Sequence, residues 1–164
     1  MFEKLLIANR GEIACRIAAT ARRMGIRTVA IYSDVDHGGL HVEACDEAVA
    51  IGGATSSESY LNIDKIINAA IQTASGAIHP GYGFLSENAN FAKAILKEGI
   101  TFVGPEEKTL RLFGDKIQAK KLAEENSIPT IRGTSGKVSY KEAENFYKSL
   151  NKKSSIMIKA VGGG

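Results

Sequence analysis

The sequence predicts an α/β fold in which helices cover a parallel β-sheet. Short apolar runs alternate with segments whose apolar residues recur at helical spacing, and the links between them are short. Such an alternation requires crossover connections, which place helices on the faces of a parallel sheet in a right-handed sense. The run TVAIY, residues 28–32, also has the β-branched, fully apolar composition of a strand buried on both faces.

The expected strands are the short apolar runs that end at turn residues. The first run, KLLIA, ends at the turn NRG, residues 9–11, and the fourth ends at HPG, residues 79–81. Ligands of parallel sheets bind beyond the carboxyl ends of strands, so we expect a ligand beside these two turns. The five expected strands cover residues 4–8, 28–32, 48–51, 77–79 and 101–103.

The expected helices lie between the strands. The isoleucine and alanine residues of segment 12–24 fall on one face of a helix, and Gly25 and Gly99 stand where glycine commonly ends a helix. Ser86 is expected to cap the helix before the fifth strand, and Glu87 suits the positive first turn of that helix. The four expected helices cover residues 12–24, a segment that Asn62 or Asp64 opens and that runs to about residue 74, and residues 87–98 and 106–113.

Gly114 interrupts this pattern, and we place a domain boundary there, between residues 1–113 and 114–164. Asp115 can cap a new helix that runs to about residue 126. Pro129 ends it, because the residue before a proline is disfavoured in helical conformation. The other elements expected in the second domain are a short extended segment at 130–132, a helix at 140–151 and a strand at 155–160, whose run IMI is apolar.

Composition and charge indicate a globular protein with a basic second half. Hydrophobic residues make up 44% of the chain and charged residues 24%, which is ordinary for a soluble domain. Residues 1–107 contain 9 Lys and Arg against 13 Asp and Glu, whereas residues 108–164 contain 12 against 5. This excess favours an anionic ligand in the second segment, although a solvated lysine-rich surface is an equal alternative on charge alone.

The cysteines and the hydropathy of the chain favour a cytoplasmic protein. Cys15 and Cys45 have neither CxxC nor metal-ligand spacing, as in a reduced intracellular compartment. No apolar run reaches the roughly 18 residues of a membrane span, and the strand-like run directly after Met1 leaves no room for a signal peptide.

Two stretches could carry binding chemistry. In HPGYGFLSEN, residues 79–88, two glycines flank Tyr82 and allow a sharp turn at the ligand-binding edge; the alternative is an ordinary strand-to-helix loop. Near the end of the sequence, Lys159 precedes three glycines, Gly162, Gly163 and Gly164. Consecutive glycine amides can turn toward phosphate oxygens, and the lysine adds a point charge; the alternative is a disordered tail.

The first turn, NRGE at residues 9–12, lacks the G-x-G-x-x-G spacing of a dinucleotide-binding loop. The sheet therefore resembles a Rossmann fold without its pyrophosphate loop, which argues against a nicotinamide or flavin function.

Taken in order, several segments resemble a known family: LLIANRGEIACRI, TVAIYSDVD, CDEAV, SYLN, HPGYGFLSENANFA, FVGP and GDKIQAK. The sequence is similar over its whole length to the biotin carboxylase component of biotin-dependent carboxylases, and is identified as an N-terminal fragment of one. The resemblance implies a Rossmann-like pre-ATP-grasp domain followed by the truncated start of an ATP-grasp domain. It also implies that ATP and bicarbonate form carboxyphosphate, whose carbon dioxide is captured by biotin on a carrier protein.

The resemblance also implies roles for individual residues. Phosphate contacts are implied for Lys116 and Lys159, and a mobile loop over the phosphates for Gly162, Gly163 and Gly164. The wall of the biotin site is implied for Tyr82 and Gly83, a supporting role for Glu87, and a dimer contact for Arg16. The catalytic groups and the ligands of Mg²⁺ or Mn²⁺ are expected beyond residue 164.

The partners implied are a biotin carboxyl carrier protein or domain, a carboxyltransferase and a second copy of the subunit. No nucleic acid and no membrane is expected as a partner. The link GGATSS and the loosely matching residues 132–155 depart from the family pattern. Two alternatives stay open: another ATP-grasp ligase of the carbamoyl-phosphate type, and a non-catalytic binding module.

Overall fold

The computed structural model describes residues 2–134, 136–151 and 153–160, and the chain divides into two compact units, residues 1–110 and 111–164. This division falls inside α5 (Glu107–Gly114). The domain boundary expected at Gly114 stays a prediction.

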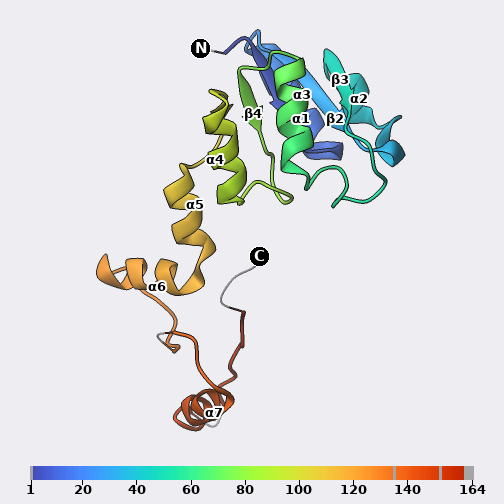
Figure 1. Ribbon diagram of the computed structural model, residues 1–164. Coiled ribbons are helices and arrows are strands. Elements are labelled where there is room, and N and C mark those ends of the chain that lie inside the picture. The colour runs from blue at the N-terminus through green and yellow to red at the C-terminus, as the bar shows by residue number, and fades with distance from the viewer. Residues whose placement is uncertain (1, 135, 152, 161–164) are drawn as a thin grey trace. The chain divides into compact units, whose positions relative to one another are not determined.

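The first unit contains a five-stranded parallel sheet, which confirms the predicted α/β class (Figure 1). The strand order is β3-β2-β1-β4-β5, so β1 is central. In its register, Ile7 lies opposite Ala30 on one side and His79 on the other, so β1, β2 and β4 end close to one another. The strands are β1 (Lys4–Ile7), β2 (Arg27–Tyr32), β3 (Glu47–Ala50), β4 (Ala77–His79) and β5 (Thr101–Phe102).

Alternate residues of the strands point to opposite faces of the sheet and build two hydrophobic clusters. Leu5 and Ile7 of β1 pack with the apolar side of α1 (Gly11–Arg23). Leu6 of β1 packs on the other face, with residues of α3 (Ile63–Gln72) and α4 (Ala89–Lys97) (Figure 1). The two-sided burial explains why Leu5, Leu6 and Ile7 of β1 are apolar without alternation.

Two details differ from the sequence-based expectation. The helix expected to begin at Glu87 with Ser86 as its cap begins at Ala89, because Asn88 Oδ1 accepts a 3.0 Å hydrogen bond from the amide of Phe91. The link between β2 and β3 also contains a 3₁₀ turn, η1 (Asp34–Asp36), and a short helix, α2 (Leu40–Ala44). Sequence periodicity did not predict either element.

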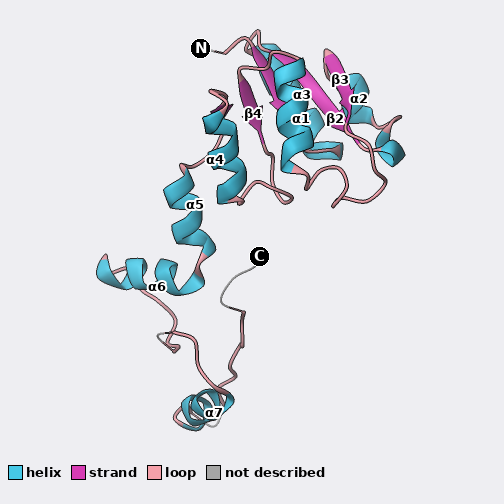
Figure 2. Ribbon diagram, viewed as in Figure 1, coloured by secondary structure: helices cyan, strands magenta, loops and turns pink. Residues whose placement is uncertain are grey.

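The second unit contains two helices, α6 (Lys116–Glu125) and α7 (Tyr140–Lys148), and among its described residues no strand (Figure 2). Asp115 caps α6 as predicted: its Oδ1 accepts hydrogen bonds from the amides of Ile117 at 2.8 Å and Gln118 at 3.1 Å. The ammonium group of Lys120 donates to the carbonyls of Gly133 and Thr134, which ties the following loop to α6.

The strand expected at residues 155–160 is wrong. Within residues 153–160 the backbone has no strand partner, and Met157 and Ile158 are each 80% exposed. An extended segment becomes a strand only when its amide and carbonyl groups pair with a neighbour. The apolar run has the composition of a strand, but composition does not show whether a neighbouring strand is there to pair with it.

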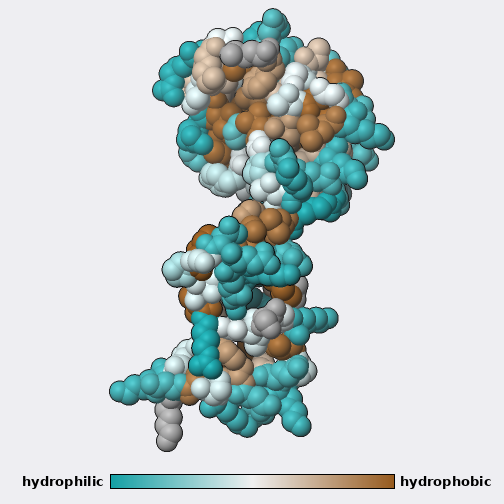
Figure 3. Space-filling view, turned by 90° about the vertical axis from the view of Figure 1, so that its left-hand side faces the viewer, coloured by the Kyte–Doolittle hydropathy of each residue, from teal (hydrophilic) through white to brown (hydrophobic). Residues whose placement is uncertain are grey.

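The two units differ in burial. All buried hydrophobic side chains among the described residues lie at or before Leu110. On the side of the molecule seen in Figure 3, hydrophilic side chains cover much of the second unit. Among the residues that the structure describes, no helix has both the length and the apolarity to cross a membrane.

The core of the first unit can be tested on α3. Ile66 is completely buried, whereas Ile71 on the same helix is 53% exposed. Ile66→Ala should lower the free energy of unfolding by about 2–5 kcal/mol, because it removes buried methyl groups and leaves a cavity. Ile71→Ala is the control and should cost less than about 1 kcal/mol. Urea unfolding followed by circular dichroism measures both, and equal losses would contradict this packing.

The second unit should be the less protected part of the chain. Its described residues have no buried apolar side chain, and few such contacts mean a low free energy of local opening. Backbone amides of residues 140–148 should therefore exchange with deuterium faster than those of α3. Hydrogen exchange read by mass spectrometry checks this, and equal protection of the two helices would refute it.

Candidate functional site

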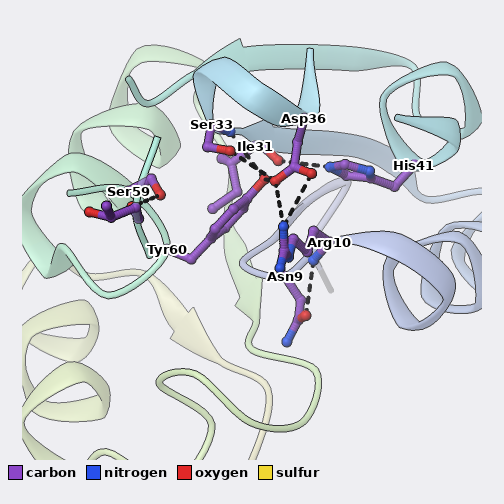
Figure 4. Close-up of polar contacts among 9 residues, drawn as sticks. Asn9, Arg10, Ile31, Ser33, Asp36, His41, Ser59 and Tyr60 are labelled. Atoms are coloured by element: carbon purple, nitrogen blue, oxygen red, sulfur yellow. Dashed lines mark hydrogen bonds and ion pairs between the residues drawn. The ribbon is translucent and has the colours of Figure 1, made fainter. Parts of the chain in front are cut away.

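The candidate site of the first unit lies at the carboxyl edge of the sheet, where the turns after β1, β2 and β4 meet. The first turn supplies Asn9 and Arg10, the second supplies Asp36, and the loop before α3 supplies Tyr60 (Figure 4). The turn after β4 supplies the segment from Pro80 to Phe84. Because parallel strands end at the same edge, these segments are neighbours although some of their contacts join residues more than 70 positions apart in sequence.

Asn9 joins the turn after β1 to the turn after β4. Its side chain is 3% exposed, and its Nδ2 donates 2.8 Å hydrogen bonds to the carbonyl oxygens of Pro80 and Tyr82. Its Oδ1 accepts from the amide of Arg10 at 2.9 Å. Gly81, between the two acceptors, has φ +66°, and a Cβ atom there would lie 2.7 Å from Asn9 Nδ2. Only glycine therefore fits this position without displacement of the asparagine.

Arg10 joins the same turn to the turn after β2. Its Nη1 donates to both carboxylate oxygens of Asp36, at 2.9 and 3.2 Å. The guanidinium carbon lies 5.6 Å from the ring centre of Tyr60 and 5.9 Å from that of Phe84. These two rings are stacked, with centroids 5.1 Å apart and planes inclined by 14°. The arginine thus lies over an aromatic pair while its charge is balanced by a carboxylate.

The carboxylate of Asp36 stays ionised at neutral pH. Burial alone would raise its pKa, but hydrogen bonds donated by Tyr60, Ser33 and Arg10 lower it below the ordinary value. The hydroxyls of Tyr60 and Ser33 each lie 2.8 Å from Asp36 Oδ2. Burial raises the pKa of Tyr60 to about 12, so that hydroxyl remains a donor. The network is therefore suited to holding segments in place rather than to proton transfer.

Tyr82 is exposed at the tip of the loop after β4, with 63% of its surface accessible. Its hydroxyl donates a 3.2 Å hydrogen bond to Glu12 Oε2 on α1, and the nearby carboxylate raises the pKa of the tyrosine. Gly83 has φ +67° and open space where a Cβ atom would stand. One ring face could therefore receive a flat ligand beside an unobstructed backbone.

Arg16 is exposed on α1, one helical turn after Glu12. Burial, and then the charge of Arg16, lower the pKa of His79. The neutral His79 ring can accept through Nδ1 from the amide of Gly81, at 3.0 Å. Beside these residues lies an open hollow of about 790 Å³. Its lining comes from Arg10, Gly11, Glu12, Cys15, Arg16, Asp36, Gly39, Leu40 and His41.

The structure brings some of the sequence-predicted site residues together and not others. Tyr82, Gly83 and Arg16 all lie at the carboxyl edge of the first unit. Glu87 is exposed in the turn before α4.

The predicted phosphate-binding residues belong to the second unit. Lys116 is the exposed first residue of α6, and Lys159 is exposed in a segment without regular secondary structure. Gly162, Gly163 and Gly164 lie outside the described residues. The roles assigned to all of these residues stay predictions.

Sequence reasoning missed Asp36 and Tyr60 as members of this site. The signal for Asp36 was present, because the acidic SDVD stretch directly follows the buried strand β2 and must emerge at the same edge. Tyr60 had no comparable signal, since its position depends on the long loop before α3. Residues 2–134, 136–151 and 153–160 contain no group of three or more His, Cys, Asp or Glu that could hold a metal ion.

Comparison with known proteins identifies the family of this chain. The profile of the family "Biotin carboxylase, N-terminal domain" matches residues 1–110. The propionyl-CoA carboxylase alpha chain of Ruegeria pomeroyi is 51% identical over 165 residues, which is 100% of this chain and 24% of the relative. The chain spans 22–24% of the length of the propionyl-CoA carboxylase alpha chains of Ruegeria pomeroyi and Rattus norvegicus.

Solved structures agree with this assignment. The biotin carboxylase domain dimer of Hydrogenobacter thermophilus 2-oxoglutarate carboxylase, in complex with MgADP, ADP and bicarbonate, is 41% identical with a TM-score of 0.92. That match covers 100% of this chain and 36% of the other. Kluyveromyces lactis urea carboxylase is 53% identical with a TM-score of 0.78, over 79% of this chain and 12% of the other. The chain therefore belongs to the biotin carboxylase N-terminal domain family.

Proposed function

We propose that this chain provides the N-terminal part of an ATP- and bicarbonate-dependent biotin carboxylase. The observation that carries the proposal is the match of the whole chain to a biotin carboxylase domain described as a complex with MgADP and bicarbonate. In the proposed reaction, ATP and bicarbonate form carboxyphosphate, and the ureido nitrogen of carrier-bound biotin captures the carbon dioxide released from it.

In this proposal, residues of the first unit contact biotin. Tyr82 offers an exposed ring face and Gly83 a backbone without a side chain, which together suit a flat, weakly polar ring. The hydrogen bond from Tyr82 to Glu12 limits the positions that the phenol ring can adopt. Glu87 supports the loop in this proposal, and Arg16 contributes to contact with a second subunit.

In the same proposal, residues of the second unit contact the phosphates of the nucleotide. Lys116 and Lys159 would place ammonium groups on nucleotide phosphates, and the glycines that follow Lys159 would supply amide donors. Magnesium or manganese would neutralise phosphate charge in the proposed reaction. The described residues do not form a site for that ion, so we assign no step of the reaction to a metal held by this chain.

The proposed partners follow from the same family. A biotin carboxyl carrier domain would present biotin, and a carboxyltransferase would pass the carboxyl group to the final acceptor. The relatives are named for propionyl-CoA, urea and 2-oxoglutarate, so family membership alone does not assign the acceptor. We also propose a homodimer and a cytoplasmic location for the complete protein.

Residues 1–164 alone should have no measurable bicarbonate-dependent ATPase activity, with or without free biotin. The proposed function needs metal ligands that the described residues lack, and removal of residues that act as a unit removes nearly all of the rate. A coupled assay for ADP release measures the activity. Turnover that appears with the purified chain and disappears with its Lys116→Ala variant would contradict this expectation.

In a subunit of the relatives' length that carries this sequence, Lys159→Ala and Tyr82→Ala should affect different substrates. Loss of a charge-assisted contact should weaken ATP binding by about 1.5–3 kcal/mol, or roughly 10- to 100-fold. Tyr82 offers a ring face and no charge, so Tyr82→Ala should raise the KM for biotin and leave ATP affinity nearly unchanged. Calorimetric titration with ATP and initial rates against biotin distinguish the two, and an equal loss of ATP affinity in both variants overturns the assignment.

A further inference from the structure

We propose that Asn9 is a positioning residue for the biotin site: its buried side-chain amide fixes the backbone from Pro80 to Tyr82 and thereby sets the affinity for biotin. The inference rests on the proposed function, because it takes Tyr82 as the residue that biotin contacts. Asn9 itself is 3% exposed and so cannot meet a substrate directly.

The backbone pairing of the sheet ends just before Asn9. The backbone pairing of β1 with β4 continues to the amide of Ala8, which donates to the carbonyl of His79 at 2.8 Å. The chain then turns, and the next two contacts come from the Asn9 side chain, which donates to the carbonyls of Pro80 and Tyr82. A side chain thus supplies the donors that fix the shape of the loop where backbone pairing stops.

The role of Asn9 requires a side-chain amide. Both donors of Asn9 Nδ2 are used, and Oδ1 accepts from the amide of Arg10, so the side chain is satisfied on both sides. An aspartate would keep the acceptor but would place an anionic oxygen about 2.8 Å from two carbonyl oxygens. That arrangement is repulsive, and the loop would have to move away from it.

The side-chain amide of Asn9 is also closely packed against the loop. Gly81 lies so close to Asn9 that a Cβ atom would stand 2.7 Å from Nδ2. On the other side of Tyr82, the guanidinium of Arg10 lies over the ring of Phe84. Two consecutive residues of the first turn therefore hold the loop on either side of Tyr82, while the tyrosine itself stays exposed between the two fixed points.

The test compares Asn9→Asp with Asn62→Asp in a subunit of the relatives' length that carries this sequence. Asn62 caps α3 as an acceptor only, through Oδ1 to the amide of Lys65, and aspartate performs that role equally well. Asn9→Asp should raise the KM for free biotin at least about tenfold while the KM for ATP stays within about twofold. Asn62→Asp should change neither. A general loss of folding would instead lower the rate without separating the two substrates.

A second pair of variants disturbs the same contact from the other side, which keeps the inference testable if Asn9→Asp does not fold. Gly81→Ala pushes against Asn9, whereas Gly99 has a similar positive φ, +71° against +66° at Gly81, with nothing within 4 Å of a carbon added there. Gly81→Ala should raise the KM for biotin, and Gly99→Ala should not. The inference is overturned if the folded variants at positions 9 and 81 keep the wild-type KM for biotin, or if the KM for ATP rises equally.

Tyr82→Ala separates this inference from the proposed function. If Tyr82→Ala raises the KM for biotin and the variants at Asn9 and Gly81 do not, Asn9 has no positioning role although the biotin site is correctly placed. If none of these variants changes the KM for biotin, the inference and the placement of the biotin site fail together. If the variants at all three positions raise it selectively, both are supported.

Discussion

The loop that carries Tyr82 depends on the side chain of Asn9, which supplies hydrogen-bond donors where the backbone pairing of the sheet ends. Parallel strands pair through backbone amides and carbonyls, but the chain after β4 turns sharply at Gly81, where φ is +66°. The carbonyls of Pro80 and Tyr82 lie beyond the end of β4, and the side-chain amide of Asn9 supplies their donors. Without it, a buried carbonyl would be left unpaired, at a cost of roughly 1–3 kcal/mol.

The neighbouring Arg10 also holds loops in place beyond the ends of the strands, through a charged side chain. Its pairing with Asp36 fixes the turn after β2, and its contact with the ring of Phe84 fixes the far end of the Tyr82 loop. Tyr60 closes the arrangement, because it donates to Asp36 and stacks on Phe84. An ion pair this well supplied with hydrogen bonds can be held at the edge of a protein without the loss that an unpaired buried charge would cause.

Helices and strands could be predicted wherever apolar residues recur at a regular spacing. Site residues could be predicted only where a motif indicates the carboxyl edge of the sheet. Alternating strands and helices followed from apolar spacing, and Asp115 was recognised as a cap because helix N-termini favour such side chains. The cap at Asn88 was misplaced by two residues because Ser86 has the same chemistry and sequence alone does not choose between them. The contacts of Arg10 with Asp36 and Tyr60 could not be predicted from local sequence, because segments more than 20 residues apart supply them.

Burial differs between the two groups of residues to which the proposed function assigns roles. The loop with Tyr82 is attached to a sheet whose strands are packed on both faces, so its geometry can exist before any ligand binds. Lys116 and Lys159 belong to a unit in which no described residue is buried, so packing within that unit does little to fix their positions. Under the proposed function, the loop that would contact biotin is therefore preformed, whereas the lysines that would contact phosphate take their final geometry only through contacts with nucleotide or with further parts of the protein. Ordering those lysines would cost conformational entropy, which would make the nucleotide affinity, more than the biotin affinity, sensitive to whatever else packs on the second unit.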